Sequence, residues 1–404
     1  MDALPALLRE GYLWLPHRRS KESGAATRGR LAGLRFTGVE GSDALRFFYD
    51  ENNIRRSGAM PEPILSTLFG HGAVHTLDGE EHRHRKAVFT HLLMPPESVA
   101  GLTAAVMRSW EAERPAWAGR ERVVLFDASA RVLTRAVSGW AGLDPDEGEI
   151  DRLRDDLVAM VDGFATAGPR HWRARAARYR RERWLSGIVR EVRAGTLAAR
   201  EGTALEVIAR HRDRDGVLLP ERVAAVEVLN VLRPTVAICW FVTYAAHALH
   251  FWPQHRERLA AGDTAFATAF QHEVRRYYPF APFIGGRAAR DTGWAGTPIP
   301  GGSMVLPDLY GQNHDERVFP RPYDFRPERF VENPPGEWDL VPQGAGDPET
   351  GHRCPGERIV VGVLEALSMR LAASHYRVPP QNLHIRADRI PARVASGFVV
   401  TSFS

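Results

Sequence analysis

The chain has 404 residues and a mass of 45.1 kDa, which is enough for two or three domains or for one large enzyme. Its composition, 44% hydrophobic and 25% charged, excludes an intrinsically disordered chain, a collagen and a coiled coil as descriptions of the whole. The net charge of +4 is too small to indicate a nucleic-acid partner by itself.

Apolar periodicity of the helical kind dominates the chain, and strand patterns are few, so we predict a mainly α protein with a small β region. The expected helices are Glu81–Leu93, Pro96–Arg114, Asp127–Gly142, Glu149–Gly163, His171–Arg193, Ala204–Arg212, Pro220–Phe251, Ala265–Tyr277 and Glu357–Ser374. The expected strands are Leu34–Gly38, Gly286–Ala289, Ser303–Leu306 and Gly397–Ser404, with a turn over Gly296–Gly302.

The most apolar stretch, Thr235–Leu249, is shorter than the roughly 18 residues that a membrane span needs, and His250 and Pro253 follow it. We therefore expect a buried helix and no membrane span. With only two cysteines, Cys239 and Cys354, and a start that lacks an apolar signal core, the sequence predicts free thiols and a cytoplasmic location.

Regular periodicity disappears between Asn313 and Cys354, and an ordered coil of that length is usually functional. The coil ends in PQGAGDPETGHRCPGER, directly before a helix. The free N–H groups at that helix start favour a thiolate at Cys354. Gly356 leaves room for a flat group, and His352 and Arg353 offer cations for its carboxylates. These are the requirements of a thiolate-bound haem; the alternative, a small buried hydrophobe, is our interpretation of Cys239.

Three motifs in the order helix, coil, cysteine loop carry a resemblance to a known family: Glu273 with Arg276, FRPERF, and the loop Gln343–Arg358. Together they resemble the haem-thiolate cytochrome P-450 superfamily. The resemblance implies the cytochrome P-450 fold over residues 1–404 as a single catalytic domain, with haem b as cofactor and Cys354 as the axial ligand of its iron.

Glu273 and Arg276 lie at i and i+3 on one helix face, where they can pair with each other and with Arg326 or Arg329 of the coil. Their role would be structural, because they would hold the coil that carries the cysteine. The alternative is an exposed surface pair, but the neighbouring Phe280 and Phe283 favour burial.

The long apolar helix contains LNVLRPTVAI, without the acidic residue and threonine that usually deliver protons to bound oxygen in this superfamily. With the cysteine loop and GAVHTLDGEEHRHRK, this segment resembles the bacterial fatty-acid peroxygenase and decarboxylase branch. That resemblance implies long-chain fatty acids as substrates, hydrogen peroxide as oxidant, no required redox partner, and terminal alkenes with α- or β-hydroxy acids as products.

Arg233 stands in the middle of this helix, and a lone buried charge costs several kcal/mol, so it requires an anion. Its helical neighbours Leu229, Val236 and Ala237 supply none, and Pro234 kinks the helix and opens a groove. A permanent acidic partner from elsewhere is the alternative. A bound fatty-acid carboxylate fits, and it would do the acid–base work on peroxide.

The resemblance also assigns roles to residues in other segments. Histidine at the position of His75 is associated with alkene-forming members and glutamine with a hydroxylating member; Phe69 and Phe283 are expected to line the substrate site. His82 and Lys86, at i and i+4, match the family's contacts to the haem propionates. Without the resemblance, His75 reads as a packing residue, and His82 with Lys86 as an exposed helix face.

The run PRHWRARAARYRRERW (Pro169–Trp184) contains seven arginines, as a nucleic-acid-binding stripe would, but we favour an exposed helix face and expect no nucleic-acid partner. Three alternatives to the alkene-forming function remain at this stage. They are a peroxygenase that only hydroxylates fatty acids, a reductase-dependent monooxygenase, and a haem or lipid carrier without catalytic activity.

Overall fold

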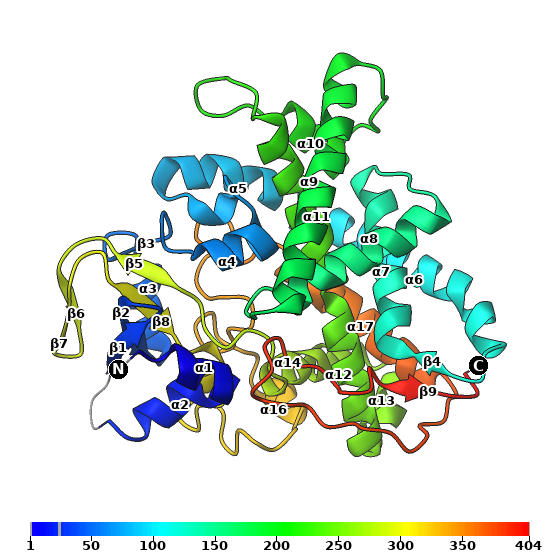
Figure 1. Cartoon of the computed structure of the whole chain (residues 1–404). Coiled ribbons are helices and arrows are strands. Elements are labelled where there is room, and N and C mark those ends of the chain that lie inside the picture. Colours follow the sequence, from blue (N-terminus) through cyan, green and yellow to red (C-terminus); the bar gives the residue numbers. More distant parts are fainter. Residues whose placement is uncertain (1, 23–25, 404) are drawn as a thin grey trace.

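The structure is a computed structural model that describes residues 2–22 and 26–403. A mixed sheet with the N-terminal helices forms one side of the molecule, and a larger helical part forms the other (Figure 1). The first helices are α1 (Leu4–Glu10), α2 (Trp14–Arg19), α3 (Ser42–Tyr49), α4 (Glu62–Ile64), α5 (Gly79–Leu93), α6 (Pro96–Ala118), α7 (Leu125–Ala141) and α8 (Glu147–Asp162). They are followed by α9 (Pro169–Ala194), α10 (Ala204–Arg210), α11 (Glu221–Val236), α12 (Ile238–Phe251), α13 (Arg256–Ala260), α14 (Thr264–Tyr277), α15 (Leu309–Asn313), α16 (Glu328–Glu332) and α17 (Glu357–Ala373).

The strands are β1 (Ala26–Leu31), β2 (Leu34–Val39), β3 (Ile54–Arg55), β4 (Val123–Val124), β5 (Gly286–Ala288), β6 (Thr292–Trp294), β7 (Thr297–Ile299), β8 (Met304–Pro307) and β9 (Val399–Val400). Five of them form a sheet in the order β1-β2-β8-β5-β3, in which only β2 and β8 run parallel, with Phe36 opposite Met304. Strand β9 pairs with β4, which attaches the end of the chain to the helical part.

The expected long helix Pro220–Phe251 is present but interrupted, because α11 ends at Val236 and α12 begins at Ile238. The break at Ala237 lies three residues after Pro234; the hydrogen bond that this proline cannot make, to the Asn230 carbonyl, falls inside α11 and not at the break. The joined stretch Glu221–Phe251 is long and apolar enough to cross a membrane by length and composition alone, but 94% of its apolar window is buried inside the fold. It forms the centre of the helical core, where Trp240 meets Phe126 edge to face at 4.7 Å.

Two strand predictions require correction. The tail forms a strand only at Val399–Val400, not over Gly397–Ser404, and Ser404 lies outside the described residues. The expected turn Gly296–Gly302 contains strand β7, which forms a hairpin with β6. Both errors arise because glycine and proline mark turns more strongly than they mark the short strands beside them.

The coil between Asn313 and Cys354 is attached to the Glu273–Arg276 pair of α14. Both side chains of this pair are fully excluded from solvent. Arg276 Nε and Nη2 donate to the two oxygens of Glu273 at 2.8 and 2.7 Å. Arg276 Nη1 also donates to the carbonyls of Asn313 and Pro322, at 2.9 and 2.7 Å. The pair therefore attaches α14 to two points of the coil.

The expected second arginine is Arg329, whose Nε lies 3.2 Å from Glu273 Oε2. Arg326 differs from the expectation, because its guanidinium binds the exposed Glu332 at 2.8 Å and only its backbone N–H reaches Glu273. The reason is geometric: Arg326 precedes α16, so its amide points at the carboxylate while its side chain points to the surface.

We predict that Glu273→Gln lowers the free energy of unfolding by about 3–5 kcal/mol, since it leaves two buried guanidinium groups without their counter-charge. Chemical denaturation followed by circular dichroism measures this loss. Arg386→Gln is the control, because the Arg386–Asp388 pair is exposed and its loss should leave stability unchanged. Equal stability of Glu273→Gln and the unsubstituted protein would contradict the structural role.

Candidate active site

The loop that carries Cys354 is held against α14 by a second buried arginine, Arg275, which is 1% exposed. Arg275 Nη2 donates to Gln343 Oε1 at 2.6 Å and also binds the carboxylate of Glu357, in the first turn of α17. The Gln343 carbonyl in turn accepts the N–H of Cys354 at 3.1 Å. Arg275 was not predicted as a site residue, because the charges of this helix were already explained by the neighbouring Glu273–Arg276 pair.

Burial raises the pKa of the Cys354 thiol, while the N–H of Gly356 and the charges of Lys86 and Arg233 lower it by smaller amounts. The expectation that the start of α17 alone favours a thiolate is therefore wrong for the protein part of the site. Desolvation of the sulfur outweighs the helix terminus, so the anion requires a bound cation, and metal coordination deprotonates a thiol outright.

A group of basic side chains lies close to the cysteine loop. The rings of His82 and His352 stack with centroids 3.9 Å apart, and His82 Nδ1 and His352 Nε2 are buried without hydrogen-bond partners among the described residues. Burial lowers the pKa of His82 to about 4 and lowers that of His352 further; Arg56 contributes to both shifts. Arg56, 6% exposed, belongs to this group and was missed because it follows a two-residue strand.

Two residues expected to contact the haem also bind protein groups, and their contacts with the cofactor stay predictions. Lys86 Nζ donates to the carbonyls of Gly351 and Arg353, so it connects α5 to the cysteine loop. Burial lowers the pKa of Lys86 to about 8. Arg353 is not a free cation, because its Nε donates to Glu357 at 2.7 Å, four residues along the chain.

These residues fit haem b. Cys354 on a glycine-rich loop would provide a thiolate ligand, and the unpaired nitrogens of His82 and His352 would match the two carboxylates of a porphyrin. A Cβ atom on Gly356 would lie 3.7 Å from the Cys354 sulfur, an ordinary contact distance, so the protein atoms alone do not require glycine there. The role of Gly356 beside the cofactor stays a prediction.

Arg233 is 5% exposed, and its Nη2 donates to Asn230 Oδ1 at 3.1 Å. Its Nε has no hydrogen-bond partner, and no carboxylate of residues 2–22 and 26–403 lies within 4.0 Å of the guanidinium. The ring of Phe69 is 5.4 Å from Cζ. Burial, with a further contribution from Arg178, lowers the pKa of Arg233 to about 9, so the group is charged at neutral pH.

Phe69 ends a single π-helical turn, Leu65–Phe69, whose last carbonyls are held by α9. Arg178 donates to the carbonyls of Leu68 and Phe69, at 2.6 and 2.8 Å. Gly70 follows with φ +85°, and a Cβ atom there would lie 2.1 Å from Arg178 Nη2, so only glycine allows this approach.

The arginine run of α9 is therefore not a uniformly exposed helix face. Arg178 and Arg181 are buried and pair with Glu182 and Asp156, at 2.7 and 2.6 Å, while Trp172 and Tyr179 are exposed. A periodicity of 3.6 residues places every third or fourth residue of the run on the inner face, and Arg178 and Arg181 are three residues apart. Arg178 holds the Phe69 turn and Arg181 joins α9 to α8, so neither is available to a nucleic acid.

His75 lies in a short 3-10 turn, with its ring centroid 4.5 Å from that of Phe69. Burial, followed by the charge of Arg233, lowers the pKa of His75 to about 3, and its Nδ1 has no partner among the described residues. The imidazole is therefore neutral at physiological pH and acts as a hydrogen-bond donor or acceptor, not as an imidazolium acid. Phe283 packs against Trp14 at 5.7 Å, so its place in the substrate site stays a prediction.

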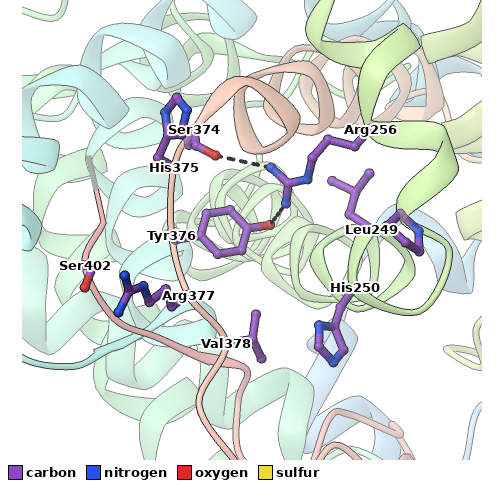
Figure 2. A pocket seen from close by; sticks show the side chains of 10 residues that line it. Leu249, His250, Arg256, Ser374, His375, Tyr376, Arg377, Val378 and Ser402 are labelled. Carbon is purple, nitrogen blue, oxygen red and sulfur yellow. Dashed lines mark hydrogen bonds between the residues drawn. The ribbon is translucent and has the colours of Figure 1, made fainter.

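A separate cavity of about 580 Å³ opens between α12, the segment after α17 and the C-terminal residues (Figure 2). Arg256 and Arg377 line it, and the donors of Arg256 are already used by the carbonyls of Leu371, Ala372 and Ser374 and by the Tyr376 hydroxyl. Arg256 thus caps the C-terminus of α17. Its terminal N–H groups are thus already occupied by protein acceptors.

Comparison with known proteins agrees with this geometry. A model of the cytochrome P450 family matches residues 263–360. Cytochrome P450 4e5 of Drosophila mettleri is 32% identical over 110 residues, 27% of this chain and 20% of that protein. The putative cytochrome P450 137 of Mycobacterium tuberculosis is 23% identical over 310 residues, 70% and 63% of the two chains. The matches thus span less than two thirds of these curated relatives.

Solved structures match the whole chain. Cytochrome P450SP alpha (CYP152B1) in complex with (R)-ibuprophen is 40% identical, with a TM-score of 0.97 over 100% of this chain and 99% of that one. Cytochrome P450EX alpha (CYP152N1) with myristic acid is 38% identical, with a TM-score of 0.95 over 100% and 97%. A variant of cytochrome P450 OleT in complex with arachidonic acid is 35% identical, with a TM-score of 0.95 over 100% and 96%.

The chain therefore belongs to the cytochrome P450 family, in the branch that the sequence indicated, and it has the cytochrome P-450 fold. It is an oxidoreductase whose cofactor is haem b.

We predict that Cys354 is the haem ligand. The reduced carbon-monoxide complex of the unsubstituted protein should show the red-shifted Soret band of thiolate ligation, and Cys354→Ala should lose it because no other thiol reaches the site. Cys239→Ala is the matched control, since Cys239 lies buried inside α12. Loss of the band in Cys239→Ala with retention in Cys354→Ala would reverse the assignment.

Proposed function

We propose that this protein is a hydrogen-peroxide-dependent enzyme that decarboxylates long-chain fatty acids to terminal alkenes, with α- and β-hydroxylation as competing outcomes. One observation carries the proposal: Arg233 is a buried, charged guanidinium that has no carboxylate partner among the described residues and whose Nε is unpaired. The myristic and arachidonic acid complexes of the similar structures support a fatty acid as the missing anion.

A carboxylate fits Arg233 for physical reasons. Burying a cation without a counter-charge is costly, and a bidentate carboxylate offsets that cost with two charge-assisted hydrogen bonds. The Nε and the free Nη positions of Arg233 are available for this geometry, because its bond to Asn230 uses only Nη2. The alkyl chain of the acid would be accommodated by apolar neighbours such as Phe69.

The carboxylate then does the work of the absent acid–threonine pair. Held by Arg233, it accepts a proton from hydrogen peroxide and returns it to the oxygen that leaves as water. Bound haem supplies the redox chemistry, with Cys354 as its thiolate ligand. Arg233 orients the acid by its head, so the carbon atoms next to the carboxylate are nearest to the reaction centre, and oxidation falls there and not at the chain end.

The balance of this reaction requires no redox partner. One fatty acid and one hydrogen peroxide give one terminal alkene, one carbon dioxide and two waters, with two electrons passing from the acid to peroxide. In the competing reaction the acid and peroxide give a hydroxy acid and one water. A reductase-dependent monooxygenase would instead need protons delivered from the protein, and α11 contains no acidic residue directly followed by a threonine.

We also propose that residues 1–404 form one catalytic domain located in the cytoplasm. Helix α17 packs on α6, α12, α13 and α14, and the β4–β9 pair joins the C-terminal residues to the helical part. Both cysteines are free thiols, as a reducing compartment would keep them.

We predict that Arg233→Ala folds and binds haem but loses peroxide-driven turnover of fatty acids by a factor of at least about 10², the scale of a lost acid–base contribution. The products of purified protein with fatty acid and peroxide are measured by gas chromatography. In the unsubstituted protein, short carboxylates such as acetate should support peroxide consumption with a substrate that has no carboxyl group, because Arg233 can hold them; in Arg233→Ala they should not. Arg258→Ala, in an exposed pair, is the control. Undiminished fatty-acid turnover in Arg233→Ala would refute the substrate-assisted mechanism.

We predict that His75→Gln lowers the ratio of alkene to hydroxy acid while total turnover persists. The two outcomes compete from the same bound state, and about 1.4 kcal/mol changes their ratio tenfold. His75 is neutral, so its effect acts through the placement of its ring N–H beside Phe69 and Arg233. An unchanged product ratio would remove His75 from product choice. Hydroxy acids as the only products of the unsubstituted protein would identify the hydroxylating peroxygenase.

A further inference from the structure

Glu227 of α11 is a buried carboxylate that the mechanism above does not use, and its side chain is 1% exposed. It accepts three hydrogen bonds from three separate parts of the site. Its Oε1 accepts the backbone N–H of Val74 at 2.8 Å and Arg85 Nη1 at 3.1 Å, and its Oε2 accepts Asn230 Nδ2 at 3.1 Å. Val74 immediately precedes His75, and Asn230 is the residue that binds Arg233.

The contact with Glu227 determines which way the Asn230 amide points. A carboxylate only accepts hydrogen bonds, so it must face the NH2 group of Asn230, and the Oδ1 atom is then turned toward Arg233. The opposite orientation would place two oxygens against each other on one side and two donors on the other. Glu227 thereby fixes the position of Arg233 Nη2 through Asn230, although six residues separate it from Arg233.

The charge of Glu227 is compensated by Arg85 of α5 and not by Arg233. The carboxylate can therefore direct Arg233 through a neutral amide without neutralising it. Had an acid occupied the position of Asn230, its carboxylate would have formed a permanent pair with Arg233 and excluded a substrate anion.

We propose that Glu227 is a positioning residue that places the carboxylate anchor, Arg233, and the turn that carries His75 relative to each other. It controls fatty-acid affinity through Asn230 and product choice through the N–H of Val74. The proposal rests on the function proposed above, because it assigns to Arg233 and His75 the roles given there.

Glu227→Gln tests whether Glu227 sets the orientation of the Asn230 amide and, through it, the position of Arg233. The new side chain keeps an acceptor for Val74 but presents an NH2 group to Asn230 Nδ2, so Asn230 must turn and place its own NH2 group against Arg233. In the haem-loaded protein, we expect the dissociation constant for myristate, measured by isothermal titration calorimetry, to rise about tenfold. The fraction of alkene among the products should change as well.

Asp156→Asn is the matched control, because Asp156 is also a buried acid with arginine partners, Arg180 and Arg181, but contacts neither Asn230 nor Val74. A merely structural role for Glu227 would make the two variants alike, with lower melting temperatures and unchanged myristate affinity and product ratio. That result would overturn the proposal.

Two further variants separate the effect on fatty-acid affinity, which acts through Asn230, from the effect on product choice, which acts through Val74. In an Asn230→Ala background, Glu227→Gln should no longer change myristate affinity but should still change the product ratio; an undiminished affinity effect would overturn the relay through Asn230. If Glu227→Gln alone does not fold, Arg85→Met combined with it removes both buried charges and should show the same loss of affinity.

Failure of the proposed function is seen separately. The unsubstituted protein would then neither bind myristate nor convert it, whatever happens at Glu227. A crystal structure of Glu227→Gln still tests the positioning role in that case. Loss of the contact between Arg233 Nη2 and Asn230 Oδ1 would support it, and an unmoved Arg233 would overturn it.

Discussion

The site depends on the uncompensated charge of Arg233. A guanidinium inside an apolar helix, 5% exposed, carries a large desolvation cost, and burial lowers its pKa only to about 9. The folded protein therefore holds a cation at neutral pH that its own described residues do not neutralise. An external carboxylate offsets that cost, which makes acid recognition a consequence of the fold and explains why the substrate's head group becomes part of the catalytic apparatus.

Three other buried arginines of the site differ from Arg233, because each has an acidic partner. Arg276 pairs with Glu273 and binds carbonyls of the coil; Arg178 pairs with Glu182 and binds the carbonyls that end the Phe69 turn. Arg85 pairs with Glu227, whose other contacts fix the turn before His75. These three pairs hold the surroundings of Arg233 in place; Arg56 is also buried without an acidic partner among the described residues, but it donates to the carbonyl of Gly285.

The sequence predicted the larger helices to within a few residues and the elements of the cysteine loop, because both depend on local patterns: apolar periodicity, and glycines before a helix start. It missed the short helices α1, α2 and α3. Strand β1 was missed because ATRGRL alternates polar residues, and its pairing with β2 is a tertiary contact. The inner arginines of α9 were missed because a run of like charges reads as exposed unless the partners on other helices are known. Arg56 and Arg275 act through contacts between distant segments, which no local pattern contains.

The spacing of the charges along α11 explains how one helix can hold an acid and an unpaired base. Glu227, Asn230 and Arg233 follow one another at intervals of three residues, so Glu227 and Arg233 are separated by about 9 Å of helix rise, too far for a direct ion pair. Asn230 links the two side chains, because its NH2 group donates to Glu227 and its Oδ1 accepts from Arg233. Arg85 of α5 compensates the charge of Glu227, so the charge of Arg233 is left for the substrate.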